Sequence, residues 1–223
     1  MLVLLAFLVH VKSERETISI SVQVTKYDSP PKITILSPEN KTYKDAMFNI
    51  SISETAPWCA YSLDGAANVT MIEFNATYFN LTITNISEGI HNVSFSCNDT
   101  ANNFNSTALQ EFSINRTKPP VSLISPLNGT STSGNVEFKY NVTHARNISS
   151  CSLIIDNSIV ATNTSVNISQ ENIFIYAPSA STHQWSINCT DDIGNVGNSS
   201  LFSITIESDS TTTGGSGALG NIV

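Results

Sequence analysis

The sequence has little charge, and above all little positive charge. Only 13% of its 223 residues are Asp, Glu, Lys or Arg, and ten basic against eighteen acidic residues leave a net charge of −8. This is about half the charged share of an ordinary soluble domain. Proteins that bind nucleic acid carry a patch or stripe of Lys and Arg to meet the phosphates. The composition therefore argues against nucleic acid as a partner.

Histidine is also scarce, with only His10, His91, His144 and His183. No two of them have the i, i+4 spacing of helical metal ligands, and His-Glu-x-x-His does not occur. His91 and His183 hold equivalent positions in an internal repeat, so we expect structural roles for both. Because no acid–base or nucleophile set is found, the sequence predicts no catalytic residue and no enzyme.

Two other patterns point to ligands only formally. Asp99, Asp191 and Asp192 could offer oxygen atoms to calcium, but a calcium site usually needs several carboxylates, and the turn-forming preference of Asp accounts for these residues. Residues 215–220 match Gly-x-Gly-x-x-Gly, but the strand before and the helix after that a dinucleotide loop requires are missing. We expect no metal site and no cofactor.

No apolar run reaches the roughly 20 residues that span a bilayer. The run from Leu2 to Val11, interrupted by His10, fits the apolar region of a secretory signal with a small residue, Ser13, before a mature start at Glu14. A buried strand is the alternative. The charged residues that usually precede such a region are absent, so the chain could begin upstream. We predict a signal peptide over residues 1–13 and an extracellular or secreted protein.

The chain contains two copies of one pattern. Cys59 is followed by Cys97, and Cys151 by Cys189, 38 residues later in both cases. Pro-Pro and Ser-Pro-x-Asn-x-Thr occur at the start of each copy. A repeat of about 90 residues indicates tandem domains. We predict one domain over residues 30–117 and a second over residues 118–207.

Four cysteines allow three pairings. The matched spacing favours Cys59–Cys97 and Cys151–Cys189, one disulfide in each domain. Two buried free thiols per domain are the alternative. Domains of this size bury a modest fraction of their surface, and a disulfide closing such a loop contributes roughly 4 kcal/mol.

Asn-x-Ser/Thr sequences are about three times as frequent as this composition gives by chance, and 17 of the 24 Asn begin one. Alternating strands explain part of the excess, since they place Asn and Thr on one face. We interpret the rest as N-glycosylation; a polar sheet face without sugar is the alternative. The candidate residues are Asn40, Asn49, Asn68, Asn75, Asn80, Asn85, Asn92, Asn98, Asn105, Asn115, Asn128, Asn141, Asn147, Asn163, Asn167, Asn188 and Asn198.

Short alternating segments at intervals near ten residues predict an all-β fold, with two consecutive β-sandwich domains of about seven strands each. The first set is 33–36, 47–52, 58–63, 69–74, 78–83, 90–97 and 109–114. The second set is 121–124, 136–142, 151–155, 159–162, 173–176, 184–189 and 201–206.

Turn residues support this reading. Asp64-Gly65 and Asp156-Asn157 fall at matching positions between strands and suit tight hairpins with positive φ. Asn102 and Gly194 match after the second cysteine of each domain, where both types tolerate the left-handed region.

Cys-x-Asp-x-x-Gly-Asn after an aromatic-rich strand, with Pro-Pro and Ser-Pro-x-Asn at the domain start, resembles the Ig-like repeats of archaeal and bacterial cell-surface proteins. The resemblance covers about residues 30–207. Antibody domains join their second and sixth strands, B and F, by a disulfide. Here Cys59 falls in the third predicted strand, beside Trp58. The departure implies a bridge between strands C and F, which are neighbours in one sheet.

The chain ends carry separate predictions. Residues 14–29 form an N-terminal strand and linker; in the strand, from Thr17 to Thr25, apolar residues alternate. It could pair with domain one, remain from an upstream domain, or complete a neighbouring molecule as a donor strand. Residues 208–223 are rich in Ser, Thr and Gly and read as a flexible linker. The resembled proteins often continue through such a linker to a membrane anchor, which this chain does not contain.

Aromatic residues could instead form a sugar-binding platform from Tyr43, Trp58, Tyr61, Tyr78 and Trp185. We expect the two tryptophans in the cores, because both fall on predicted strands.

The leading function is an extracellular structural or adhesive stalk segment of a cell-surface glycoprotein. The alternatives are a module that binds carbohydrate or another surface protein, and a pilus-like subunit that assembles through the segment from Thr17 to Thr25.

Overall fold

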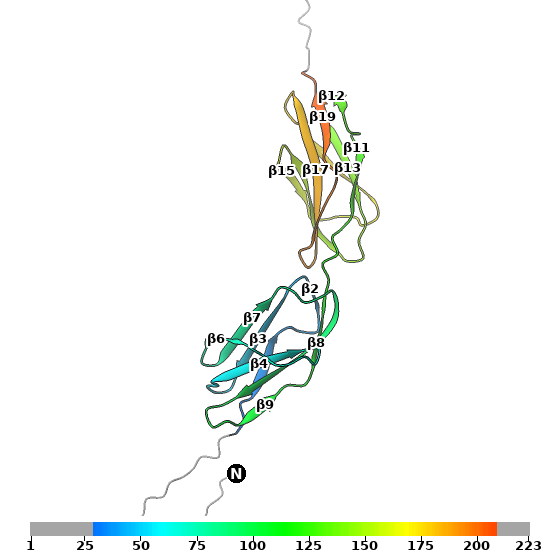
Figure 1. Ribbon diagram of the computed structural model, residues 1–223. Helices are drawn as coiled ribbons and strands as arrows, with labels where there is room; N and C mark the ends of the chain where they lie inside the picture. The colour runs from blue at the N-terminus through cyan, green and yellow to red at the C-terminus, as the bar shows by residue number, and fades with distance from the viewer. Residues whose placement is uncertain (1–28, 209–223) are drawn as a thin grey trace, which may run out of the picture.

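The structure is a computed structural model that describes residues 29–208 (Figure 1). It contains two consecutive β-sandwich domains, so the predicted fold class is confirmed. The predicted signal peptide over residues 1–13, the predicted strand from Thr17 to Thr25 and nearly all of the predicted C-terminal linker lie outside the described residues. Within residues 29–208, no helix is long and apolar enough to cross a membrane.

Domain one packs two sheets face to face. One sheet has the order β1-β3-β7-β6, and the other has the order β2-β10-β8-β4-β5 with β9 paired to β8. The strands are β1 (Ile33–Ser37), β2 (Thr42–Tyr43), β3 (Ala46–Ile52), β4 (Trp58–Leu63), β5 (Val69–Thr70), β6 (Ile72–Asn75), β7 (Tyr78–Ile83), β8 (Gly89–Asn98), β9 (Phe104–Ser106) and β10 (Gln110–Ile114).

Domain two repeats this plan with one strand fewer. Its sheets have the orders β11-β13-β16 and β12-β19-β17-β14-β15, with β18 paired to β17. The strands are β11 (Val121–Ser125), β12 (Thr130–Thr132), β13 (Val136–Val142), β14 (Ile148–Ile155), β15 (Ser158–Asn163), β16 (Glu171–Tyr176), β17 (Thr182–Asp191), β18 (Val196–Asn198) and β19 (Phe202–Ile206).

The predicted strand 69–74 is wrong as a single element. Val69 and Thr70 pair with β4 in one sheet, whereas β6 pairs with β7 in the other. Met71 is buried at the crossing between the sheets. Domain two keeps the matching segment, β15, on β14 throughout and has no counterpart of β6.

The other long strands agree with the prediction to within three residues at each end. The prediction missed the short strands β2, β9, β12 and β18, which have two or three residues each and are too short for a period of two to be recognised.

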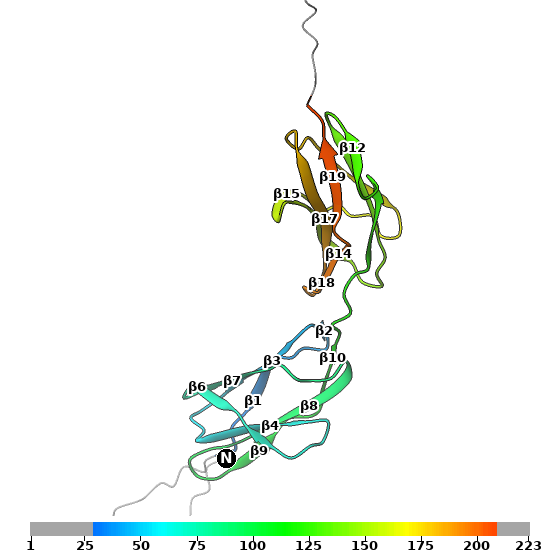
Figure 2. The ribbon, with the colours of Figure 1, turned by 45° about the horizontal axis from the view of Figure 1, so that its top comes forward.

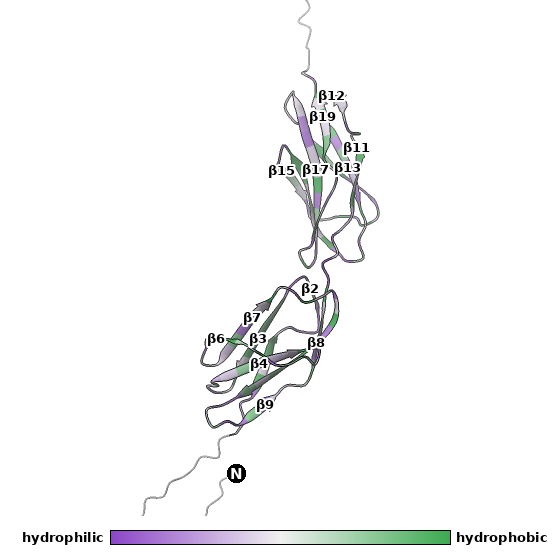
Figure 3. Ribbon diagram, viewed as in Figure 1, coloured by the Kyte–Doolittle hydropathy of each residue, from purple (hydrophilic) through white to green (hydrophobic). Residues whose placement is uncertain are grey.

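Alternating side chains fill the two cores, and Figure 3 shows the alternation of hydropathy along the strands. In domain one, Phe48 meets the rings of Phe95 and Phe112 edge-on, with centroids 5.6 and 5.8 Å apart. In domain two, Trp185 is fully buried and meets Phe138 with centroids 4.9 Å apart. Edge-to-face pairs of this kind stabilise a core beyond the area they bury.

The two turns predicted at Asp64-Gly65 and Asp156-Asn157 have positive φ at both central residues, with values of 51° and 75° in the first and 48° and 65° in the second. Asn102 and Gly194 also lie in the left-handed region, at 62° and 88°. The turn predictions are therefore confirmed. Such hairpins match the right-handed twist of the strands they join.

Replacing Trp185 by Ala should lower the free energy of unfolding of domain two by about 3–5 kcal/mol, because a large side chain leaves a cavity in a closed core. Ile175→Ala is the matched control, since Ile175 is 66% exposed in the same domain. It should change that free energy by less than about 0.5 kcal/mol. Chemical denaturation of both variants measures the difference, and equal losses would contradict the placement of Trp185.

Candidate functional site

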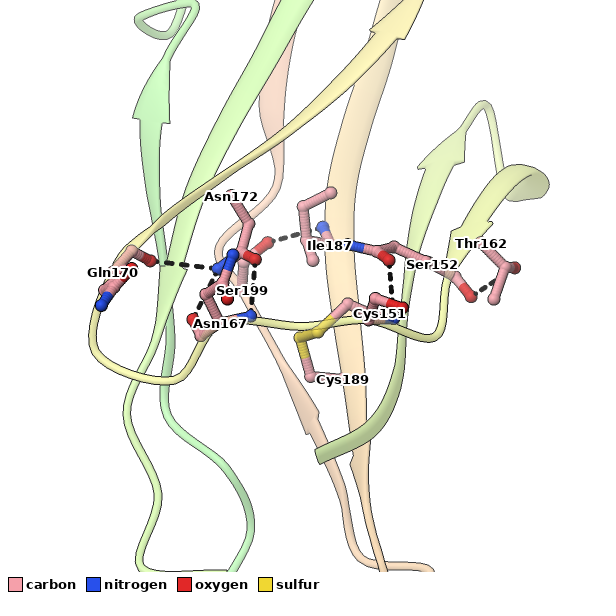
Figure 4. Close-up of a disulfide and its surroundings, with 11 residues drawn as sticks. Cys151, Ser152, Thr162, Asn167, Gln170, Asn172, Ile187, Cys189 and Ser199 are labelled. Carbon is pink, nitrogen blue, oxygen red and sulfur yellow. Dashed lines mark hydrogen bonds between the residues drawn. A yellow bond between two sulfur atoms is a disulfide. The ribbon is translucent and has the colours of Figure 1, made fainter. Parts of the chain in front are cut away.

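Each domain has one disulfide between directly paired residues of neighbouring strands. Cys59 on β4 faces Cys97 on β8, and Cys151 on β14 faces Cys189 on β17. All four cysteines are fully buried. Each disulfide therefore lies within a single sheet of its own domain and joins the two neighbouring strands that correspond to C and F. Figure 4 shows the disulfide of domain two.

Polar contacts surround the disulfide of domain two (Figure 4). The Ser152 hydroxyl lies 2.9 Å from that of Thr162 on the next strand. Asn172 is 4% exposed, and its amide donates to the carbonyl groups of Asn167 and Gln170 and accepts from the Asn167 N–H. These bonds fix the loop between β15 and β16 where domain two has no counterpart of β6.

His91 and His183 each join a hairpin turn to the strand that carries the second cysteine. The His91 Nδ1 lies 2.7 Å from the Asp64 carboxylate, and its Nε2 lies 2.9 Å from the Ser87 carbonyl oxygen. In domain two the matching distances are 2.6 Å from His183 to Asp156 and 2.9 Å to Ser179. The same Asp accepts the backbone N–H of the residue after each His.

Both ring nitrogens of His183 face acceptors, which favours the imidazolium form. Hydrogen bonds to the Asp156 carboxylate and to the Ser179 carbonyl raise the pKa of His183 above its ordinary value. The hydrogen bond from His183 and that from the Gln184 N–H lower the pKa of Asp156. The pair joins the turn at Asp156 to β17. The sequence analysis did not predict the carboxylate partner of either histidine. The separation of 27 residues between Asp and His in both domains was the available signal.

Asp99 and Asp191 use their oxygens inside tight turns. Asp191 is 1% exposed and accepts from the N–H groups of Ile193 and Asn195 and from the Asn195 amide. Burial acts to raise the pKa of the Asp191 carboxyl, but these hydrogen bonds outweigh it and the pKa is lowered. Asp99 accepts the matching bonds from Ala101 and Asn103. Both residues are turn formers, and no cluster of three metal-ligating side chains occurs within residues 29–208.

The junction between the domains is closely packed. Lys44 donates to the Gly194 carbonyl at 3.2 Å, and the Asn195 amide donates to the Asn115 carbonyl at 3.2 Å. A Cβ added to Gly197 would lie 1.7 Å from the Pro119 carbonyl oxygen. Gly197 thus allows β18 to approach the linker backbone directly.

The aromatic residues separate into core and surface. Trp185 is in the core, as expected, whereas the core prediction for Trp58 is wrong. Cys59 points inward, so its neighbour Trp58 points to the outer face, where it is half-buried and donates to Thr70 Oγ1 at 3.3 Å. Tyr61 packs edge-on against Phe48, Tyr43 donates to the backbone of Glu39, and Tyr78 is exposed. These residues do not form one platform.

The candidate glycosylation residues are spread over both domains. The exposed ones are Asn40, Asn68, Asn75, Asn85, Asn128, Asn147, Asn167 and Asn198, and the others are half-buried. Asn49 lies directly opposite Asn80, and Asn188 directly opposite Asn198. Directly opposed residues have Cβ atoms about 4.5–5.5 Å apart. Two sugars would crowd each other there, so we predict partial occupancy at each of these two pairs.

A hollow of about 530 Å³ lies at the first hairpin of domain one, lined by Tyr61, Leu63, Val69 and the turn between them. Its carboxylate, Asp64, already binds His91 and Asn92. Tyr61 is the other titratable side chain in the lining of this hollow.

No family model matches the chain, and no curated protein matches it in sequence. Solved structures do match. The fibronectin(III)-like modules of Clostridium thermocellum CbhA are 14% identical, with 79% of this chain and 93% of that one covered and a TM-score of 0.49. Chimeric titin Z1Z2 is 16% identical, with coverages of 81% and 98% and a TM-score of 0.39.

A 1.5-MDa bacterial ice-binding adhesin is 12% identical, with 80% of this chain and 66% of that one covered and a TM-score of 0.38. All three are below 20% identity to this chain, and the two-sandwich fold described above is read from its own strand pairing.

Replacing both Cys59 and Cys97 by Ala should lower the free energy of unfolding of domain one by about 4 kcal/mol, because the open chain regains the entropy of a 38-residue loop. Domain two keeps its own disulfide and should unfold as before. Calorimetry of the intact tandem resolves the two transitions. Unfolding of domain one at its original temperature would contradict the stabilising role of the bridge.

Domain two should melt at a lower temperature at pH 9 than at pH 6. A raised native pKa makes protonated His183 stabilising below its ordinary pKa of 6.5, and this contribution is lost as the pH rises through the native pKa. The lowered pKa of Asp156 adds stability above its ordinary value of 3.8, which is lost on acidification. Melting curves between pH 4 and pH 9 test this. His183→Gln should flatten the alkaline side of the profile; an unchanged profile would refute it.

Proposed function

We propose that this chain is an extracellular structural segment, a stalk or adhesive spacer, of a cell-surface glycoprotein. Two buried disulfides support an oxidising, extracellular location, because such bonds persist outside the cytosol. The high density of glycosylation sequences points to the same location. The segment acts mechanically, by holding its two ends apart.

The single observation that carries the proposal is the end-to-end arrangement of the domains. In Figures 1 and 2 the two sandwiches follow one another, and the described chain enters at one end and leaves at the opposite end. Arg116 of the linker binds domain one through an ion pair with Asp45 and a hydrogen bond to the Ile86 carbonyl. Pro119 of the linker packs directly against Gly197 of domain two. The linker is thus anchored on both sides.

Strand pairing within the domains suits a load along this axis. The strands β2 and β10 are parallel neighbours, and β12 and β19 repeat the arrangement. One member of each pair lies near the N-terminal end of its domain sequence and the other at the C-terminal end. Tension applied to the two ends of a domain therefore pulls the paired strands in opposite directions along their length. All the hydrogen bonds between the two strands then oppose this sliding at the same time.

A carbohydrate-binding module remains the second candidate. Phe104 is 56% exposed on the sheet face that also carries Trp58. Exposed aromatic rings often mark a recognition surface.

Residues 29–208 should behave in solution as an elongated monomer without hydrolase activity. Small-angle scattering should give a radius of gyration well above the roughly 16 Å of a compact domain of that length. Gly197→Ala should loosen the junction and broaden the distribution of interdomain distances, because its Cβ displaces Pro119. A compact particle with the domains side by side would refute the stalk. Binding to an oligosaccharide array would favour the second candidate.

A further inference from the structure

Three residues form a row across the outer face of domain one. Trp58 on β4 lies opposite Asn98 on β8, and Asn98 lies opposite Phe104 on β9. These three strands are neighbours in one sheet (Figure 2). Directly opposed residues have Cβ atoms about 4.5–5.5 Å apart. Asn98 therefore lies between the positions of two aromatic residues, of which the Trp58 indole reaches toward Thr70 on β5 and Phe104 is exposed.

The orientation of the row follows from the disulfide. Cys59 and Cys97 point into the core, so their neighbours Trp58 and Asn98 point outward. The Asn98 Oδ1 is buried and accepts no hydrogen bond from the described residues. Asn98 itself is half-buried, and Nδ2 is the atom of its amide that carries an N-linked sugar.

Domain two supplies a comparison at the same positions. Its row is Ser150, Thr190 and Val196, in the same register on β14, β17 and β18. There the aromatic rings are absent, and Thr190 cannot be glycosylated through nitrogen. The sandwich therefore does not need aromatic residues at these positions, and the exposed ring of Phe104 in domain one calls for another explanation.

We propose that Asn98 carries an N-linked glycan whose first sugar rests on the exposed ring of Phe104, next to Trp58. Asn98-Asp99-Thr100 is a glycosylation sequence at the end of β8. A pyranose ring has a face of C–H groups, and an aromatic ring has an electron-rich face that attracts them. The attached sugar would cover Phe104, which is 56% exposed, and would turn a bare apolar surface into an internal contact.

The consequence is that this glycan stabilises domain one, whereas sugars elsewhere act mainly as solvated cover. Asn92 is the matched comparison, because it lies on the same strand and the same outer face but pairs with Glu111. The inference rests on the proposed extracellular location, since only an exported chain meets the glycosylation machinery.

The test uses the full chain secreted from a cell that attaches N-linked sugars. Thr100→Ala removes the sequence and keeps Asn98, and Thr100 is exposed. This variant should lower the melting temperature of domain one by about 4 °C or more. A shift of that size corresponds to a loss of about 1 kcal/mol in the free energy of unfolding of a domain of this length. Ser94→Ala removes the Asn92 sequence in the same way and should leave the melting temperature unchanged.

A second background isolates the aromatic contact. In a chain with Trp58→Ser and Phe104→Val, which introduces the residues of domain two, Thr100→Ala should no longer change the melting temperature. In protein made without sugars, Thr100→Ala should have no effect either. Glycopeptide mass spectrometry measures the occupancy of Asn98 in each sample.

Three results would overturn the inference. Asn98 could be unmodified while other sequences carry sugar, which leaves the stalk proposal intact. The loss of stability from Thr100→Ala could be the same in both backgrounds, so that the rings make no contact. Sugar-free protein could bind a free oligosaccharide through Trp58 and Phe104, which would make this face a recognition site.

Discussion

The buried bridge between neighbouring strands is the constraint on which the rest of each domain depends. It joins the two strands at the middle of one sheet, β4 and β8 in domain one, and it fixes their register to the residue. Because side chains alternate along a strand, this register decides which face every other residue takes. Phe95 and the cysteines are held inside, and Trp58 and Asn98 are held outside. The hydrogen bonds from the histidines to Asp64 and Asp156 then secure the hairpin at the far end of these strands in each domain.

Most of the strands, the tight turns and the cysteine pairing could be predicted from the sequence, because each depends on a local pattern of residues. Alternating apolar residues gave the long strands, and Asp64-Gly65 and Asp156-Asn157 gave the tight turns, since only a few residue types accept positive φ. The repeated spacing of the cysteines led to the pairing that the structure has. The position of Trp58 was predictable in the same way, because a residue next to an inward cysteine must point outward.

What could not be predicted depends on partners distant in the chain. The segment that begins at Val69 reads as one strand, and only the packing at Met71 divides it between two sheets. The row formed by Trp58, Asn98 and Phe104 exists because three strands lie side by side. No local spacing connects those three residues. The close approach of Pro119 to Gly197 could not be predicted from the sequence either, because proline and glycine are common in turns and nothing local links these two residues.

The disulfides also decide how far the segment can lengthen when a domain gives way. Cys59 and Cys97 are 38 residues apart in sequence, and the chain between them stays closed as a loop even after the strands separate. A fully extended chain spans about 3.3–3.6 Å per residue, so each bridge withholds on the order of 130 Å of length. A domain unfolded by force would therefore lengthen only by the part of its chain outside this loop. The two strands that carry the cysteines would stay covalently joined, which favours refolding.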